Sequence, residues 1–487
     1  MKKIFLAILF AVLPLLAGAQ ALKGSYFLDN SMNRHEMNPA FAPRADYFQM
    51  LGIGNMGVGF GTNLEVPTFL YPSNGELLTF LHPSISVQDF DKALAKRPHL
   101  DMEFNTTLFG FGFYTKKHSY WTFDVDVRAN LDGDLPRDLF MFLKKGTSAN
   151  NETFNVGNLN MYATAGLQAS LGYSRDIIKG LRVGAKARVI APVAYAALNL
   201  EKLSLHTAQD KWTITTEGYV HAAANGLDLS IPEGEMMPSF EFDLNRMLSN
   251  GVIAGLGYSF DLGAEYVLEL GTFFDGLSVS AAITDLGRIH YKQNAVSSFK
   301  TGGSVDWAGF QDVSMDNLDI ESSLNQFLED AKKNLLNLSE MENEKGFSRS
   351  TMPRVNVGVE LPFLKRSMSV GLLYSARMSH SYTRQELTVS YNLNPCKWFA
   401  LGLNYSFLNA TNTIGAMLEL TPRVGPAFYI GCDYVPIVFA PAPFVPVLKM
   451  LPTSLRLNLN FGIALHLGGK TTKVVKEKKG NDKKDKK

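Results

Sequence analysis

The sequence predicts an all-β protein, a transmembrane antiparallel β-barrel of about 14 strands with short helical insertions. From Leu455 to Leu467 every odd position is apolar, while the even positions carry Arg, Asn, Gly, Ala and His. Similar alternation recurs along most of the chain, and no stretch of about 20 uninterrupted apolar residues could form a spanning helix. Successive strand side chains point to opposite faces, so this pattern needs an apolar environment on one side and a polar one on the other. A barrel in a bilayer provides both.

The N-terminus has the layout of a cleavable secretory signal at residues 1–19. Lys2 and Lys3 precede an apolar run from Ile4 to Leu16, which ends in the small residues Ala17-Gly18-Ala19. The apolar run is too short to span a membrane. We therefore expect export and a location in the cell outer membrane.

The barrel is expected to occupy residues 47–468. Thr107–Thr115 and Trp121–Arg128 form one predicted hairpin, and Ala163–Tyr173 with Leu181–Val189 form a second. Leu455–Leu467 is expected to close the barrel by pairing with the strand near Tyr47–Phe60, which leaves no free edge. Further strands are predicted at 212–223, 253–270, 277–284, 355–361, 368–378, 387–391, 399–407, 414–420 and 428–434. Aromatic residues near strand ends are expected to form interfacial girdles, namely Tyr114, Tyr120, Trp121, Tyr258, Trp398, Tyr405, Phe407, Tyr429 and Tyr434.

Three interruptions carry a helical pattern. A short helix is expected after Pro136 with Gly146 as its stop, and another around Val87–Ala95. The third lies near 312–343, where Leu324, Phe327, Leu328, Ala331, Leu335 and Leu338 recur at helical spacing. Helices and long loops belong at the rims or in the lumen of a barrel.

Composition and motifs exclude several classes of function. The net charge of +1 includes nine Lys in the tail 469–487, which is expected to be disordered, so the remainder is mildly acidic and does not suggest nucleic-acid binding. Cys396 and Cys432 form no zinc or redox pattern, and no HExxH or G-x-S-x-G motif occurs. The run Gly52–Gly57 matches a dinucleotide fingerprint but continues as a glycine-rich strand. We therefore predict no enzyme activity, no catalytic residue, no metal and no cofactor.

Polar side chains on the strand faces opposite the apolar ones are predicted to line the lumen. Asp124 and Asp126 could also be drawn as a calcium site, but Arg128 on the same face can offset them. The lumen-lining candidates are Asp124, Asp126, Arg128, Arg182, Lys186, Arg188, Arg456, Asn458, Asn460 and His466.

The segment Asn38-Pro39-Ala40-Phe41 resembles the N-terminal NPA element of the outer-membrane long-chain fatty-acid transporter (FadL-like) superfamily. Ser31–Pro43, Asp134–Gly146, Asp261–Tyr266 and Ser278–Tyr291 resemble an uncharacterised family of outer-membrane barrels. The resemblance implies an N-terminal hatch segment at 20–46 in a 14-stranded barrel. The hatch candidates are Asn38, Pro39, Ala40 and Phe41.

The loop Val438–Pro452 is apolar and rich in proline although it joins two strands. It either packs against the rim and lipid headgroups or provides a stiff surface for a hydrophobic ligand, and the candidates for this surface are Phe439, Phe444, Val445 and Leu448.

Two functions are therefore considered. The first is passive passage of hydrophobic or amphipathic small molecules through the barrel. The second is a non-transporting surface scaffold, or secretion-system accessory barrel, that docks a protein partner through the helical insertion. The expected partners are outer-membrane lipid and either such a ligand or such a protein.

Overall fold

The structure, a computed structural model, describes most of the chain. The described residues are 22–50, 54–73, 76–115, 119–145, 152–157, 159–207, 212–225, 227–230, 239–242, 249, 251–270, 274–307, 338–340, 346–408, 412–441 and 450–468. The predicted signal peptide and the Lys-rich tail therefore lie outside the described residues.

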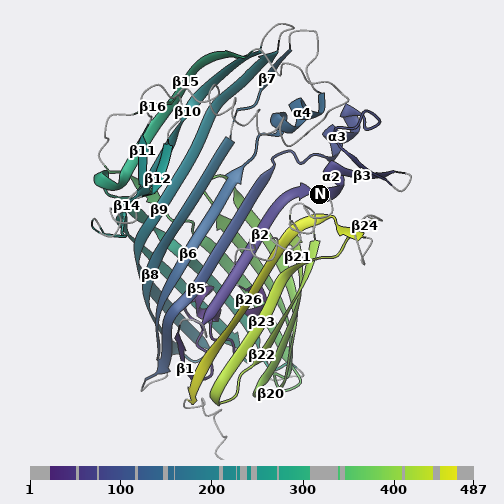
Figure 1. Ribbon diagram of the computed structural model, residues 1–487. Helices are drawn as coiled ribbons and strands as arrows, with labels where there is room; N and C mark the ends of the chain where they lie inside the picture. Colours follow the sequence, from purple (N-terminus) through teal and green to yellow (C-terminus); the bar gives the residue numbers. More distant parts are fainter. Residues whose placement is uncertain are drawn as a thin grey trace, which may run out of the picture.

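Fourteen antiparallel strand positions form a closed barrel (Figure 1), which confirms the predicted fold class. Two strands, β1 (Asp46–Met50) and β2 (Asn55–Glu65), share the first position. The other positions are β5 (His99–Tyr114), β6 (Tyr120–Asp134), β8 (Leu159–Ile178), β9 (Leu181–Thr207), β13 (Gly255–Leu268), β14 (Leu277–Tyr291), β18 (Arg354–Phe363), β19 (Met368–Met378), β20 (Thr383–Cys396), β21 (Phe399–Leu408), β22 (Asn412–Leu420), β23 (Val424–Pro436) and β26 (Ser454–Gly468).

The last strand closes the barrel against the first position, as the sequence predicted. Tyr47 of β1 pairs with His466 of β26, and Asn55 of β2 pairs with Gly462. The predicted strand Tyr47–Phe60 is thus divided into two strands. Every strand of the ring has a neighbour on both sides, so its backbone groups are satisfied without a free edge.

Strands also continue beyond the ring at the end that carries the long connections (Figure 1). The outer half of β9 pairs with β10 (Trp212–Ala224), which pairs with β15 (Val296–Trp307). The run 212–223 therefore forms a strand of this extension and not a wall position. The other short strands are β3 (Leu70–Ser73), β4 (Glu76–Thr79), β7 (Glu152–Asn155), β11 (Leu227–Ser230), β12 (Ser239–Phe242), β16 (Leu338–Glu340), β17 (Ser348–Ser350), β24 (Phe439–Pro441) and β25 (Met450–Pro452).

Two of the predicted helices are confirmed. They are α3 (Val87–Ala93), whose N-terminus is capped by the Ser86 hydroxyl, and α4 (Arg137–Lys145). The remaining helical turns are α2 (Val66–Phe69), η1 (Lys23–Ser25), η2 (Arg34–Glu36) and η3 (Gln293–Ala295). Among the described helices, none is long and apolar enough to cross a membrane.

The helical insertion predicted near 312–343 lies largely outside the described residues. Its described part, Leu338–Glu340, is the short strand β16 and pairs with β15, so a helix reaching Leu338 is wrong. Pairing with an already formed strand satisfies the backbone of these residues and overrides their helical spacing.

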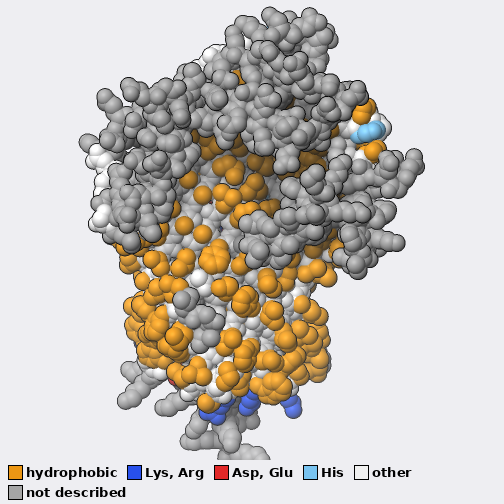
Figure 2. All heavy atoms as spheres, viewed as in Figure 1, with side chains coloured by type: hydrophobic (Ala, Val, Ile, Leu, Met, Phe, Trp, Pro, Cys, Tyr) orange, Lys and Arg blue, Asp and Glu red, His pale blue; other side chains and the backbone are white. Residues whose placement is uncertain are grey.

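The wall separates apolar and polar side chains as a bilayer requires. Along β26, Leu457, Leu459 and Phe461 are about two-fifths exposed on the outside. Their intervening neighbours Asn458 and Asn460 are buried on the inside. On the face seen in Figure 2, apolar side chains cover the lower part of the outer surface, where a lipid-facing belt is expected.

Candidate functional site

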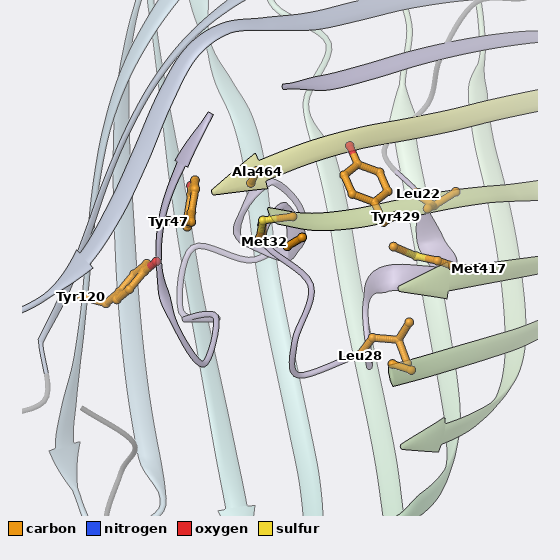
Figure 3. Close-up of a cluster of buried hydrophobic side chains, with 10 residues drawn as sticks. Leu22, Leu28, Met32, Tyr47, Tyr120, Met417, Tyr429 and Ala464 are labelled. Atoms are coloured by element: carbon orange, nitrogen blue, oxygen red, sulfur yellow. The ribbon is translucent and has the colours of Figure 1, made fainter. Parts of the chain in front are cut away.

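The N-terminal segment, residues 22–45, packs against the inner face of the barrel. Its side chains Leu22, Leu28 and Met32 form an apolar cluster with Met417 and Tyr429 and other wall residues (Figure 3). The segment therefore fills space between strands that are far apart in the sequence.

The predicted hatch residues form a tight turn. The Asn38 side-chain oxygen accepts the backbone N–H of Ala40 at 3.0 Å, and the Asn38 carbonyl accepts that of Phe41 at 2.9 Å. Pro39 fixes its own φ and restricts the preceding residue. All four residues, Asn38 to Phe41, are buried.

Two glycines make room for this turn. Gly184 of β9 and Gly263 of β13 are directly paired across the two strands. A Cβ at Gly184 would collide with the Pro39 carbonyl, and one at Gly263 with the Asn38 side chain. The Asn38 amide also donates to the Ala264 carbonyl at 3.2 Å. These glycines were a detectable signal in the sequence, because they interrupt otherwise alternating strands.

Two further glycines accommodate aromatic side chains of the segment. A Cβ at Gly358 of β18 would meet the Tyr26 ring, and one at Gly371 of β19 would meet the Phe27 ring. The Tyr26 hydroxyl and the Ser280 hydroxyl share a hydrogen bond of 3.0 Å. The wall is therefore shaped to the segment at several separate strands.

Charged groups fix the start of the segment. Asp433 accepts the backbone N–H groups of Lys23 at 2.8 Å and of Gly24 at 2.9 Å. The Lys23 ammonium forms an ion pair with Glu386 and donates to the Tyr434 hydroxyl at 2.7 Å. Both side chains of the Lys23–Glu386 pair are buried, so this contact is shielded from water.

Asp29 lies in a cationic environment on the same segment. It contacts Arg34 and Arg44, each at 2.9 Å, and Arg366 of the β18–β19 turn at 3.9 Å. Burial by itself raises the pKa of the Asp29 carboxyl, but the three arginines outweigh burial and hold that pKa below its usual range.

The ten predicted lumen-lining residues lie on the inner face of the strands, where eight are buried and Arg128 and Arg182 are partly buried. Most have a charged or polar partner. Asp124 contacts His35 of the N-terminal segment at 3.0 Å and Lys186 at 3.2 Å. Further contacts are Asp126 to Thr107, Arg128 to Asp285, Arg182 to Asp176, Arg188 to Asp261, Arg456 to Asp101, Asn458 to Asp433 and His466 to the Pro422 carbonyl. The side-chain nitrogen of Asn460 has no hydrogen-bond partner among the described residues.

Arginines and carboxylates also bridge the lumen in a network that the sequence reasoning missed. Asp101 of β5 accepts Arg384 of β20 at 2.8 Å and Arg456 of β26 at 3.1 Å. Glu103, two residues further along β5, contacts Arg377, Arg384 and Arg354. The signal available in the sequence was the alternation along β5 and β20, which places these polar residues on the inward face, opposite the apolar ones.

A cavity of about 120 Å³ adjoins the N-terminal segment on one side of this network. Glu36 of the segment forms part of its wall, together with Glu103, Arg354 and Arg377. Its apolar lining includes Ile190, Ile289 and Met352. Arg349 also lines it, with its guanidinium over the Tyr195 ring, and the Arg349 Nε has no hydrogen-bond partner among the described residues. The cavity thus combines an apolar wall with arginines and carboxylates.

A second cavity, of about 480 Å³, lies on the other side of the network and is lined by Lys96, Arg97, Arg384 and Arg456. Because Arg384 contacts Asp101 and also Glu103, the arginine–carboxylate network separates the two cavities. His380, in the turn between β19 and β20, lines the first cavity, and burial with Arg349 and Arg377 lowers the pKa of its imidazole to about 4.

The predicted ligand-surface loop is described only in part. Phe439 is 48% exposed in β24. Phe444, Val445 and Leu448 lie outside the described residues. Among the described residues, no group of three or more His, Cys, Asp or Glu side chains could hold a metal ion.

Four residues expected in the aromatic girdles face the lumen instead. Tyr120, Tyr429 and Tyr434 are buried there, and the Tyr114 hydroxyl donates to the Pro43 carbonyl of the N-terminal segment at 2.7 Å. Tyr114, Tyr120 and Tyr429 occupy the inward parity of their strands, next to outward residues such as Trp121 and Phe428. Tyr434 directly follows the buried Asp433, where the pairing of β22 with β23 shifts register, so this irregularity turns it inward. A position near a strand end therefore did not identify a lipid-facing side chain.

Comparison with solved structures finds other membrane barrels. The chain is similar to the toluene transporter TbuX of Ralstonia pickettii, with 9% identity over 93% of this chain and 96% of TbuX and a TM-score of 0.39. It is similar to a Pseudomonas aeruginosa FadL homologue, with 11% identity, 91% and 96% coverage and a TM-score of 0.36. The translocator domain of the autotransporter NalP from Neisseria meningitidis matches at 7% identity, with 87% and 89% coverage and a TM-score of 0.33. At these identities the likeness concerns the fold alone.

Comparison with curated protein sequences gives no match. A family model, described as a family of unknown function (DUF5723), matches residues 39–433. This range begins at Pro39 of the predicted hatch. It ends at Asp433, whose carboxylate accepts the backbone N–H groups of Lys23 and Gly24 at the start of the N-terminal segment. Because the match covers most of the chain, the protein belongs to family DUF5723.

Proposed function

We propose that this protein is an outer-membrane passage for amphipathic small molecules and that the N-terminal segment gates it. The observation that carries the proposal is the cavity beside Glu36, where aliphatic and aromatic side chains meet arginines. Ligand pockets characteristically combine an apolar lining with a few polar groups that orient the ligand.

The lining favours a solute with an apolar chain and an anionic group. Ile190, Ile289 and Met352 offer the apolar contact, and Arg349 offers a guanidinium with a free donor. A charge-assisted hydrogen bond to that guanidinium is stronger than a neutral one. A hydrocarbon without a polar group would offer no acceptor to the Arg349 Nε. Amphipathic solutes therefore fit this cavity better than purely hydrophobic ones.

In this mechanism Phe439 and the loop candidates Phe444, Val445 and Leu448 gather the solute at the surface. The second cavity admits it, and the arginine–carboxylate network passes its anionic group to the first cavity. Release then requires displacement of the turn Asn38–Phe41, with the lumen-lining residues forming the path. Such passage needs no chemistry and no energy source, because differential binding along the path is sufficient.

The scaffold alternative depends on the insertion at 312–343, which lies largely outside the described residues. No contact among the described residues favours it.

Binding of decanesulfonate to the purified protein tests the proposal, with decanol as the uncharged probe of equal chain length. Ile190→Trp fills the cavity, while Val189→Trp places the same ring on the neighbouring position, which is 57% exposed on the outside. We expect decanesulfonate to bind to the wild type and to Val189→Trp, and at least tenfold more weakly to Ile190→Trp. Absence of binding to the wild type, or equal binding to both variants, would contradict the proposed site.

Mass spectrometry of lipids extracted from the purified protein gives a second readout. Copurified fatty acids or other anionic amphiphiles are expected from the wild type and are expected to be depleted from Ile190→Trp. A reproducible blank from the wild type would count against a solute-binding lumen.

A further inference from the structure

Exposed cations surround the end of the barrel that carries the short turns. Arg175 lies at the end of β8, Lys365 in the β18–β19 turn, Lys397 before β21 and Arg423 before β23, and all four are exposed. These four residues form the turn rim. Figure 2 shows Lys and Arg side chains gathered under the apolar surface at this end.

The acidic side chains near the turn rim are already engaged. Asp176 pairs with Arg182 at 2.9 Å, and Glu269 pairs with Lys179 at 2.9 Å. Asp275 accepts the backbone N–H of Arg366 at 2.8 Å. Within the described part of the chain, no carboxylate lies within ion-pair distance of the four turn-rim cations. The rim therefore carries positive charge that the protein itself leaves uncompensated.

Each turn-rim cation stands beside an exposed apolar residue. Ile177 follows Arg175 by two positions, Leu364 precedes Lys365, Trp398 follows Lys397 and Val424 follows Arg423. The exposed fractions of these four side chains lie between 50% and 68%. A cation joined to an apolar or aromatic neighbour is the arrangement found where the hydrocarbon region meets lipid headgroups.

The β18–β19 turn holds its cation in an unusual backbone conformation. Leu364, Lys365 and Arg366 have φ values of 53°, 57° and 60°, in the left-handed region that non-glycine residues rarely adopt. The Leu364 carbonyl accepts a hydrogen bond from the N–H of Ser367 at 3.2 Å, and the Asp275 carboxylate accepts one from the N–H of Arg366. A strained conformation persists only where its surroundings fix it, so Lys365 is presented in a defined position.

We propose that the turn rim binds the phosphate groups of anionic phospholipids in the leaflet that contacts the short turns. In bacterial outer-membrane barrels the short turns face the periplasm, which makes this the inner leaflet. Polybasic surfaces near a bilayer attract anionic lipids, and the attraction is screened by salt. This inference does not depend on the solute or on the gate.

Trp398 supplies an intrinsic probe for the test. In the full-length chain with Trp121, Trp212 and Trp307 replaced by Phe, Trp398 is the remaining tryptophan. The protein is reconstituted in dioleoylphosphatidylcholine vesicles that contain either brominated phosphatidylglycerol or brominated phosphatidylcholine. We expect brominated phosphatidylglycerol to be preferred at Trp398 by about fivefold at low salt.

The triple variant Lys365→Gln, Lys397→Gln, Arg423→Gln, which leaves only Arg175 of the turn rim, should strongly reduce this preference. The variant Lys92→Gln, Lys145→Gln, which removes exposed cations of α3 and α4 at the other end of the barrel, should retain it. Circular dichroism checks that each variant forms the barrel. Equal quenching by both brominated lipids in the parent, or an unchanged preference in the triple variant, would overturn the proposal.

Discussion

Replacing Asp433 by alanine tests how the N-terminal segment is held in the barrel. The Asp433 carboxylate accepts two backbone N–H groups of the segment, from Lys23 and Gly24, and is itself buried. Alanine leaves both donors without their acceptor in a site from which water is largely excluded. Each buried donor left unpaired costs about 1–3 kcal/mol, so docking of the segment should weaken by about 4 kcal/mol.

A loss of this size raises the population of the undocked segment roughly a thousandfold. Amide hydrogen exchange followed by mass spectrometry should show this increase in peptides that cover residues 22–30, because exchange reports local opening. Asp176→Ala removes a carboxylate that is paired with Arg182 near the short turns and does not touch the segment, so it serves as the matched control.

Asp433 also contacts Asn404 and Asn458 of the wall, so exchange in β21 and β26 must be followed in the same experiment. Amide exchange at residues 22–30 should rise by more than any change in β21 and β26. Exchange at residues 22–30 that stays within threefold of the wild type would refute the proposed role of Asp433 in docking.

Three further predictions concern the seat of the segment and two titrating groups. Gly184→Val should displace the Asn38–Pro39 turn and increase proteolysis of residues 22–45 at least tenfold. Gly302→Val, at a position with open space, should not. Equal proteolysis of the two variants would contradict the proposed packing of the turn against Gly184. The pKa of His380 is lowered to about 4, so the imidazole is neutral at pH 7, and an anion bound nearby should raise that pKa. Calorimetry should therefore find tighter decanesulfonate binding as pH falls from 7 toward 4. The affinity of His380→Gln should depend less on pH. A pH-independent affinity in the wild type would contradict this coupling. The pKa of Asp29 is held below its usual range, so its contribution to docking is present above about pH 4 and is lost as pH falls further. Amide exchange of the segment should therefore rise below about pH 4 after correction for the intrinsic rate, and Asp29→Asn should already show the rise at neutral pH.

The strand pattern was sufficient to predict the barrel because the bilayer imposes it on every wall strand. Leu457, Leu459 and Phe461 must face lipid, and this forces Asn458 and Asn460 inward whatever their partners are. Pairing of β26 with β1 and β2 followed from the need to leave no edge.

The contacts across the lumen could not be predicted in the same way. Asp101 and Arg384 are 283 positions apart, and their contact depends on the curvature of the whole ring. The inward tyrosines were misplaced for a related reason. Strand parity for Tyr114, Tyr120 and Tyr429, and a register shift for Tyr434, turn these side chains inward. Their nearness to a strand end does not decide it.

The central claim is that movement of the N-terminal segment controls passage through the barrel. A Cβ at position 24 would lie 3.2 Å from the Met417 Cβ. This is shorter than the roughly 3.5–4.5 Å between the Cβ atoms of a disulfide, so a shift of a few tenths of an ångström allows Gly24→Cys with Met417→Cys to lock the segment to β22. Cys396 and Cys432 are replaced by serine in the same chain, which removes the native free thiols. The direct measurement is decanesulfonate flux into vesicles that contain this variant, oxidised and then reduced. The proposed gate predicts negligible flux in the oxidised protein and its recovery after reduction, whereas equal flux in both states would contradict the claim.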